Sequence, residues 1–338
     1  MRVVLRADAS SSEGSGHVMR CLTLAEALMS RGHVVHLAVT VDGIPWLSEA
    51  VARTELPVLV VAPHQLDVDE LLSVDPDWVV VDSYELPADQ VSGLGARVRV
   101  LAIVDGELRG IRAALYLEQN LGSDELDWDV PAGGRLLAGG EYALIRDAVL
   151  SERRTDPWVI DGTPRVVVVL GGTDPLGVIV PVAAQLAQLT VPIELTMVAA
   201  PQHRAEVERL LADHPSATVV ASTHALTTLL GQADLAISAA GTSAWEICAL
   251  GLPAVLIAVV DNQTGSLQRM SAEGVVLGID LTVDPAGLQR LPKLIERLCT
   301  DEPARRSLSR RASARFDGLG KQRVVEAMEL DEPRSRTI

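Results

Sequence analysis

Aromatic residues and cysteines are scarce in this chain of 338 residues. Aromatic side chains make up 3% of the sequence and hydrophobic residues 48%, so the core has to be built mainly from aliphatic side chains. A hydrophobic fraction of this size is typical of a folded chain and excludes a disordered one. The three cysteines are an odd, scattered set, which indicates reduced structural thiols of a cytoplasmic protein: Cys21, Cys248 and Cys299.

Several signature motifs are also missing from the sequence. The histidines show no metal-ligand spacing, so we expect neither a catalytic metal nor a cofactor. There is no Walker A sequence, which excludes a P-loop ATPase, and no Gly-x-Ser-x-Gly, which argues against a serine hydrolase. A dinucleotide fingerprint needs a third glycine where Met19 stands, so the signal for NAD binding is weak.

Long apolar runs and positive net charge are lacking as well. No run reaches the roughly 18–20 residues that span a bilayer, and the chain opens directly on a strand pattern without a signal-peptide layout. The net charge of −16 argues against nucleic acid or an anionic membrane as a partner. We therefore expect a soluble cytoplasmic protein, in which backbone N–H groups at helix N-termini still allow phosphate binding.

Short apolar runs alternate with helical patterns from end to end, which predicts an α/β fold of two Rossmann-like domains with parallel sheets. A helix is expected from His17 to about Arg31, ended by Gly32. A polar, Pro-containing stretch at 151–165 suggests the connection between domains at 1–150 and 151–330, with a frayed tail at 331–338. Ligands of such folds bind at the carboxyl ends of strands, here expected in the interdomain cleft. The predicted strands are 2–5, 34–39, 58–61, 78–81, 98–103, 114–117, 166–170, 194–198, 218–220, 235–238, 254–257 and 275–277.

A glycine-rich loop follows the first predicted strand and contains Gly14, Gly16 and His17. Glycines let the backbone adopt unusual conformations and leave space for a ligand. A neutral imidazole near a helix N-terminus can accept a proton from water or a hydroxyl near pH 7. Asp8, at the start of the loop, can orient it, although a turn-forming role for Asp8 and an ordinary helix-opening turn around His17 fit the sequence equally well.

The second half contains two loops suited to phosphate. One follows the strand at 166–170 and includes Gly172 and Thr173; the other runs from Ala240 through Ser243 into a predicted helix. The backbone N–H groups of a first helical turn have no intrahelical partner and can bind a diphosphate. A common turn explains the first loop as well, and simple helix capping explains the second.

Three further side chains are candidates for ligand contact. Glu246, one turn into that helix, can accept hydrogen bonds from a ribose diol, or it is a first-turn acid that favours the helix dipole. Asn262 can bind a sugar hydroxyl or acetamido group, or cap its helix. Tyr84, after the strand at 78–81, can face a ligand or cover the edge of the sheet.

Taken together, these segments resemble the nucleotide-sugar hydrolases of pseudaminic acid biosynthesis, which act on UDP-2,4-diacetamido-2,4,6-trideoxy-β-L-altropyranose. These hydrolases are related to spore-coat polysaccharide proteins and MurG-type glycosyltransferases. The most specific match is the histidine loop, and the matches follow in order over about residues 1–275. They lie at 6–10, 14–22, 81–84, 118–120, 140–146, 171–175, 241–243, 246 and 262–263.

The resemblance implies a GT-B fold and metal-independent, inverting hydrolysis of the anomeric C1–O bond of a UDP-sugar. It implies that His17 activates water, that Tyr84 and Asn262 position sugar or water, and that Gly241–Ser243 hold the diphosphate while Glu246 holds the ribose. One departure is the loop at 104–111, where family members usually carry an Asp-Asp pair and this chain has Asp105-Gly106. We therefore expect a sugar different from that of the family. A GT-B glycosyltransferase, with an acceptor alcohol in place of water, and a non-catalytic nucleotide-sugar binder are the alternatives.

Overall fold

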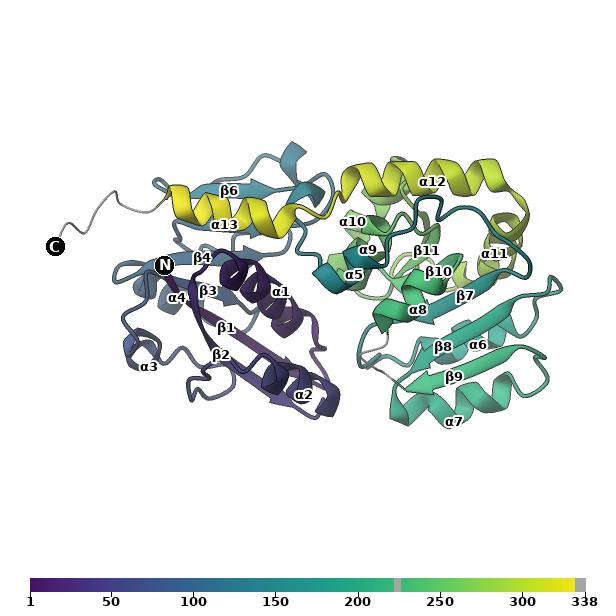
Figure 1. Cartoon of the computed structure of the whole chain (residues 1–338), viewed down its shortest axis with the longest axis horizontal. Coiled ribbons are helices and arrows are strands. Elements are labelled where there is room, and N and C mark those ends of the chain that lie inside the picture. Colours follow the sequence, from purple (N-terminus) through teal and green to yellow (C-terminus); the bar gives the residue numbers. More distant parts are fainter. Residues whose placement is uncertain (222–225, 332–338) are drawn as a thin grey trace. The chain divides into compact units, whose positions relative to one another are not determined.

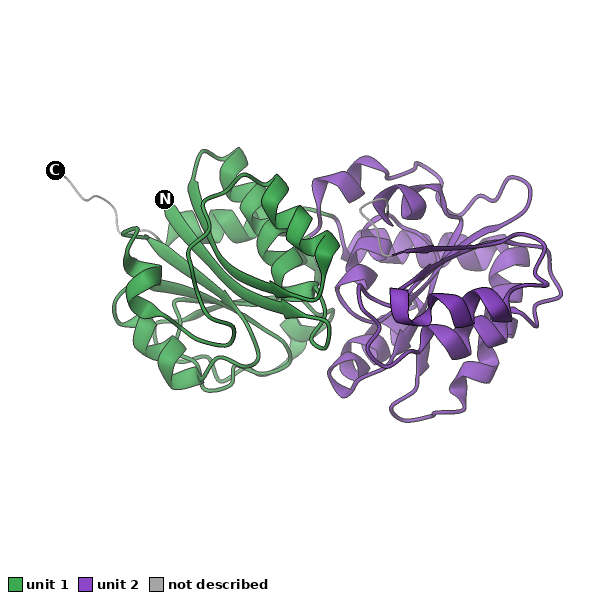
Figure 2. Cartoon of the chain, turned by 90° about the horizontal axis from the view of Figure 1, so that it is seen from below, with its two compact units in different colours: residues 1–144, 318–338 green, residues 145–317 purple. Residues whose placement is uncertain are grey.

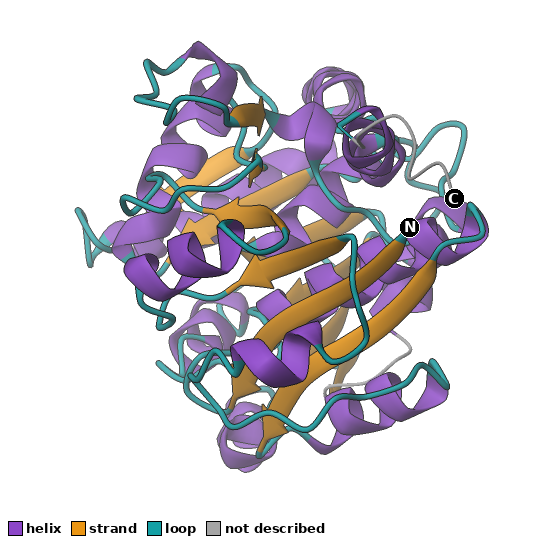
Figure 3. Cartoon of the chain, turned by 90° about the vertical axis from the view of Figure 1, so that its left-hand side faces the viewer, coloured by secondary structure: helices purple, strands orange, loops and turns teal. Residues whose placement is uncertain are grey.

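The computed structural model describes residues 1–221 and 226–331, which form two compact units (Figure 2). Unit 1 consists of residues 1–144 and the chain from Gly318 onward, and unit 2 of residues 145–317. Each unit contains one six-stranded sheet whose paired strands are all parallel (Figures 1 and 3). The prediction of two Rossmann-like α/β domains is confirmed.

The sheet of unit 1 has the strand order β2-β1-β3-β4-β5-β6. Its central strands are largely buried because both faces are covered, and two separate cores lie on the two faces. Helices α1, α2 and α13 contribute to one core and α3 and α4 to the other. The strands are β1 (Arg2–Ser10), β2 (Val34–Asp42), β3 (Trp78–Asp82), β4 (Arg99–Val104), β5 (Leu115–Glu118) and β6 (Arg135–Ala138), and the helices are α1 (Gly16–Ser30), α2 (Pro45–Arg53), α3 (Val68–Leu72), α4 (Ala88–Gly95) and α13 (Gly320–Leu330).

The sheet of unit 2 has the strand order β12-β11-β10-β7-β8-β9. Helices α6, α7 and α11 share one apolar core with the sheet. The strands are β7 (Arg165–Val169), β8 (Glu194–Ala199), β9 (Ala217–Ala221), β10 (Leu235–Ala239), β11 (Ala254–Ala258) and β12 (Leu277–Asp280), and the helices are α5 (Asp147–Ser151), α6 (Ile179–Leu186), α7 (Pro201–Leu210), α8 (Leu226–Gln232), α9 (Thr242–Ala249), α10 (Asp261–Ala272), α11 (Leu291–Thr300) and α12 (Glu302–Arg315).

Two strand predictions need correction. The run at 58–61 is not a strand, because only the backbone of Leu37 in β2 pairs with it, through Pro57 O and Leu59 N, and Val60 is exposed. Strand β6 was not predicted; it is only four residues long, and Leu137 is its one buried residue. The strand expected at 275–277 begins at Leu277 and continues to Asp280. Gly32 ends α1 with a φ of 81°, as expected.

The domain boundaries also differ from the prediction. The polar stretch at 151–165 does not connect the units but belongs to unit 2. Arg154 in this stretch contacts Asp234 and Ala233, and Arg305 donates a hydrogen bond to the carbonyl of Trp158. Residues from Gly318 onward return to unit 1, where α13 lies beside α1 (Figure 1). The tail predicted at 331–338 lies, except for Asp331, outside the described residues.

The start of α13 approaches the backbone of unit 1 closely at Gly320. A Cβ atom there would lie well under 3.0 Å from backbone atoms of Tyr142 and Ala143, which cannot move aside like a side chain. The next residue, Lys321, is buried and pairs with Glu26 of α1 at 3.2 Å. Glycine is therefore required where α13 docks.

Replacing Gly320 with alanine is expected to destabilise unit 1 by about 1–3 kcal/mol, because a methyl group is forced against fixed backbone. The matched control is Gly93→Ala in α4, where nothing lies within 4 Å of the added Cβ. That control should gain about 0.5–1 kcal/mol from the higher helix propensity of alanine. Urea unfolding monitored by circular dichroism measures both. Equal effects of the two substitutions would contradict this account of the docking.

Candidate functional site

Unit 1 brings a histidine, an aspartate and an arginine together at the carboxyl ends of its central strands. His17 is the second residue of α1, and Asp82 ends β3, the strand next to β1. The Nδ1 atom of His17 lies 2.5 Å from Oδ1 of Asp82. Arg20 donates from Nε to Oδ2 and from Nη2 to Oδ1 of Asp82, both at 2.8 Å. All three side chains are buried, with exposed fractions of 11% for His17, 1% for Asp82 and 9% for Arg20.

The conformation of the loop before α1 depends on its glycines. Gly14 has a φ of 88°, which only glycine adopts readily, and its N–H donates to the carbonyl of Ser10 at 2.8 Å. This bond closes a short turn at the end of β1, and the helix then starts at Gly16. The turn therefore delivers His17 to the edge of the sheet where β3 ends.

The electrostatics of this cluster favour an ionised Asp82. Burial alone would raise the pKa of its carboxyl group, but the positive charge of Arg20 and the hydrogen bonds from His17 and Arg20 outweigh burial, so this pKa lies below its ordinary value. A carboxylate oxygen can only accept, so the short contact with His17 requires the proton on Nδ1. In the neutral imidazole this leaves Nε2 with its lone pair, as a general base needs.

Tyr84 lies beside the imidazole. The ring centroids of His17 and Tyr84 are 4.7 Å apart and their planes meet at 82°, an edge-to-face contact. The Tyr84 hydroxyl donates to Asp105 at 2.6 Å, and the Asn120 amide donates to the other oxygen of Asp105 at 2.6 Å. The loop that departs from the family pattern thus contributes Asp105 to the surroundings of His17.

Asp8 does not take the role expected for it. Its carboxylate accepts hydrogen bonds from Arg6 at 2.6 Å, from Thr40 at 2.5 Å and from the backbone N–H of His64 at 3.2 Å. Asp8 is therefore a structural residue of β1 that ties β2 and the chain around residue 64 to the sheet. Asp82 orients the histidine instead.

In unit 2, the turn from Ala240 to Ser243 has the geometry of an anion site. The N–H of Ala240 donates a hydrogen bond to the carbonyl of Ile257. Gly241 is the N-cap of α9, and no side chain caps this helix. A Cβ on Gly241 would meet only the Gln263 amide, at 3.7 Å. The first-turn N–H groups of Thr242 and Ser243 have no intrahelical acceptor, so the turn can bind a phosphate.

The remaining predicted residues of unit 2 lie on three elements. Glu246 of α9 is buried and forms a two-pronged ion pair with Arg146, at 2.6 and 2.7 Å. Asn262 is in the first turn of α10, in the same unit as the turn at 240–243. Gly172 and Thr173 follow β7, after Gly171 with a φ of 83°. The next residue, Asp174, accepts hydrogen bonds from the backbone N–H groups that open α6.

Sequence reasoning missed the partners of two predicted residues. Arg20 could have been found, because it lies three residues after His17 and therefore on the same helical face. Asp82 could not, because nothing in the sequence says that β3 neighbours β1. Arg146 is likewise 100 residues from Glu246.

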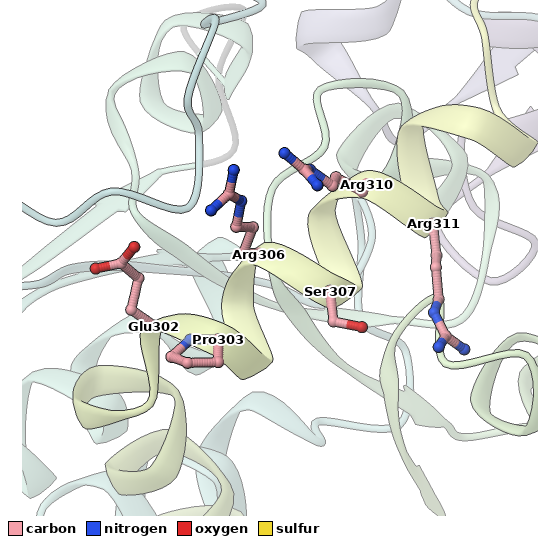
Figure 4. A pocket seen from close by; sticks show the side chains of 6 residues that line it. All are labelled: Glu302, Pro303, Arg306, Ser307, Arg310 and Arg311. Atoms are coloured by element: carbon pink, nitrogen blue, oxygen red, sulfur yellow. The ribbon is translucent and has the colours of Figure 1, made fainter.

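A basic groove of about 540 Å³ lies along α12 in unit 2 (Figure 4). Arg306 and Arg310 extend to one side of the helix and Arg311 to the other. The guanidinium groups of Arg306 and Arg310 lie 5.6 and 5.7 Å from the ring centroid of Trp158. None of the residues that line this groove belongs to the predicted site.

Two negative findings apply to residues 1–221 and 226–331. No helix there is long and apolar enough to cross a membrane. Within the same ranges, no group of three or more histidine, cysteine, aspartate or glutamate side chains is arranged to hold a metal ion.

Comparison with known proteins gives consistent matches. Residues 166–324 match the glycosyltransferase family 28 C-terminal domain. The spore coat polysaccharide biosynthesis protein SpsG of Bacillus subtilis (strain 168) is 25% identical over 353 residues, which cover 97% of this chain and 98% of SpsG. Among solved structures, MurG of Acinetobacter baumannii has a TM-score of 0.65 at 18% identity, covering 98% of this chain and all of MurG.

A second solved structure, the spinosyn rhamnosyltransferase SpnG in complex with thymidine diphosphate, has a TM-score of 0.65 at 19% identity. The match covers 97% of this chain and 100% of SpnG. These structural matches show the fold. The glycosyltransferase family 28 match adds a sequence similarity over residues 166–324, and SpsG adds one over 97% of the chain. The chain therefore has the two-domain, Rossmann-like GT-B fold, and residues 166–324 are similar in sequence to a glycosyltransferase domain.

Proposed function

We propose that this protein transfers a sugar from a nucleoside-diphosphate sugar to a hydroxyl acceptor, with His17 as the general base. The observation that carries the proposal is the 2.5 Å contact between Nδ1 of His17 and Asp82, which leaves Nε2 able to accept a proton. The sequence match of residues 166–324 to a glycosyltransferase domain supports transfer. The thymidine diphosphate named for SpnG supports a nucleoside diphosphate as the leaving group.

The reaction follows from these groups. Nε2 of His17 takes the proton of the acceptor hydroxyl while the acceptor oxygen forms a bond to the anomeric carbon. The bond between that carbon and the diphosphate oxygen breaks, and the nucleoside diphosphate leaves with the bonding electrons. The N–H groups of Thr242 and Ser243 stabilise the charge that develops on the diphosphate. A single displacement of this kind inverts the anomeric configuration.

In this proposal the other predicted residues have supporting roles. Tyr84 holds the imidazole by its edge-to-face contact and presents its ring to the sugar. Glu246 accepts a hydrogen bond from the ribose, with its position fixed by Arg146. Asn262 binds the sugar, and Gly16, Gly172 and Thr173 line the donor. A uridine nucleotide is the donor that the resemblance of the histidine loop implies.

Hydrolysis of the same donor is the second candidate. It is favoured by the resemblance of residues 14–22 to the nucleotide-sugar hydrolases and needs the same base, with water in place of the acceptor. The two activities differ in a single observable, which is whether the donor is consumed when no acceptor is present.

A mass-spectrometric screen tests the proposal. The full chain is incubated with UDP- and dTDP-linked sugars, with and without a panel of monosaccharide and alkyl alcohol acceptors, and released nucleotide and products are identified. For a transferase we expect nucleotide release only when an acceptor is present, together with a glycosylated product. Equal release in buffer alone would make the protein a hydrolase. Failure to bind UDP or dTDP in calorimetry would overturn both activities.

A further inference from the structure

Arg20 engages both oxygens of the carboxylate that orients the proposed base. It lies one helical turn after His17 on α1, and its side chain is 9% exposed. Its Nε and Nη2 atoms donate to the two oxygens of Asp82 in the parallel arrangement of a guanidinium–carboxylate pair. Two such bonds fix the rotation of the carboxylate, so Oδ1 is held toward the imidazole.

The same guanidinium approaches the imidazole itself. Nη2 of Arg20 lies 2.9 Å from Nδ1 of His17, which also faces Oδ1 of Asp82 at 2.5 Å. A lone pair on Nδ1 could accept from Arg20 but would then repel the closer carboxylate oxygen. A proton on Nδ1 satisfies the carboxylate instead. The orientation of Asp82 thus decides the tautomer, and Arg20 decides the orientation of Asp82.

Charge balance adds a second effect. The charged and titratable groups that face His17 are Asp82 at the end of β3, Arg20 on α1, Tyr84 after β3 and, through Tyr84, Asp105 after β4. Arg20 neutralises the buried Asp82. Without it, the carboxylate would be balanced by an imidazolium, which has no lone pair with which to take a proton.

We propose that Arg20 is a positioning residue that keeps Nε2 of His17 available as a base by binding both oxygens of Asp82. This inference rests on the proposed role of His17. It goes beyond that role because the basicity of Nε2 then depends on Arg20 as well as on His17 and Asp82. It also assigns Arg20, which contacts no substrate in this mechanism, a specific effect on the protonation of the histidine.

The test compares Arg20→Met with Arg20→Lys. We expect Arg20→Met to lower kcat by roughly 10–100-fold with little change in KM, and the loss should be greater at about pH 6.5 than at about pH 8.5. Lysine supplies the positive charge without the two-pronged geometry. In Arg20→Lys the pH dependence of kcat should therefore be closer to that of the wild type than kcat itself. The matched control is Glu26→Gln on the same helix, whose carboxylate pairs with Lys321 and not with this cluster.

A spectroscopic measurement separates this inference from the proposed function. With ¹⁵N-labelled histidine, NMR of the wild-type protein near neutral pH should show His17 protonated at Nδ1 and not at Nε2. Arg20→Met should show the Nε2–H tautomer or the imidazolium. If Arg20→Met does not fold, Arg20→Lys should still show a mixture of tautomers. An unchanged Nδ1–H tautomer in the folded variants would overturn the role of Arg20, whatever activity the protein has.

Discussion

Replacing His17 with alanine is expected to lower turnover of the nucleotide sugar about 10²–10⁴-fold, which is the usual contribution of a positioned general base. The acceptor hydroxyl then has no group to receive its proton. KM should change little, because in this mechanism the diphosphate is held by the turn at 241–243 and not by the imidazole. Initial rates of nucleotide release across donor concentrations measure both parameters.

The matched control is His214→Ala, a histidine of unit 2 that accepts a backbone hydrogen bond from Ser216. This variant should retain wild-type rates. If His17→Ala also retained wild-type turnover while remaining folded, His17 would have no part in the mechanism, and the general-base proposal would have to be abandoned for both transfer and hydrolysis.

Replacing Gly241 with valine is expected to weaken UDP binding roughly 100-fold or more. The backbone at Gly241 has a negative φ of −99°, so it does not require glycine, and an added Cβ would make only an ordinary contact with Gln263. The fold should therefore survive. The added methyl groups would cover the first-turn N–H groups of α9, and two hydrogen bonds to a charged group at about 1.5–3 kcal/mol each account for the loss.

Isothermal titration with UDP measures this effect, and Gly265→Ala in α10 is the control because nothing lies within 4 Å of the added Cβ. Thermal unfolding of both variants establishes that they are folded. UDP binding at wild-type affinity by Gly241→Val would show that the diphosphate does not bind at this helix start, even if turnover is confirmed.

Local pattern predicted most elements of this fold because the sheets are parallel and buried. Strands such as Val166–Val169 read as uninterrupted apolar runs, and α1 follows the helical spacing up to Gly32. The strand prediction at 58–61 was wrong because an apolar, β-branched segment also suits an extended chain that pairs with its neighbour at a single residue. Composition alone does not distinguish these cases, since the difference lies in how many backbone groups find partners.

The candidate site was predictable as far as it depends on neighbouring residues. His17 follows its glycine turn, and the turn at 240–243 is a local sequence of small residues before a helix. The orientation of His17 was not predictable in this way: the sequence suggested Asp8 as its partner, and the structure has Asp82. Both acids lie near the carboxyl end of a strand, and only the order of strands in the sheet places Asp82 beside the histidine.

The return of α13 to unit 1 has a consequence for the order in which the protein is made. Residues of α13 contribute to the same apolar core as β1 and α1, yet they leave the ribosome after all of unit 2. Unit 2 is one continuous segment and can complete its core during synthesis, as domains generally do. Unit 1 is started first and finished last. Until α13 arrives, the face of α1 that it covers, which includes Glu26, remains a surface on which chaperones or neighbouring nascent chains can act.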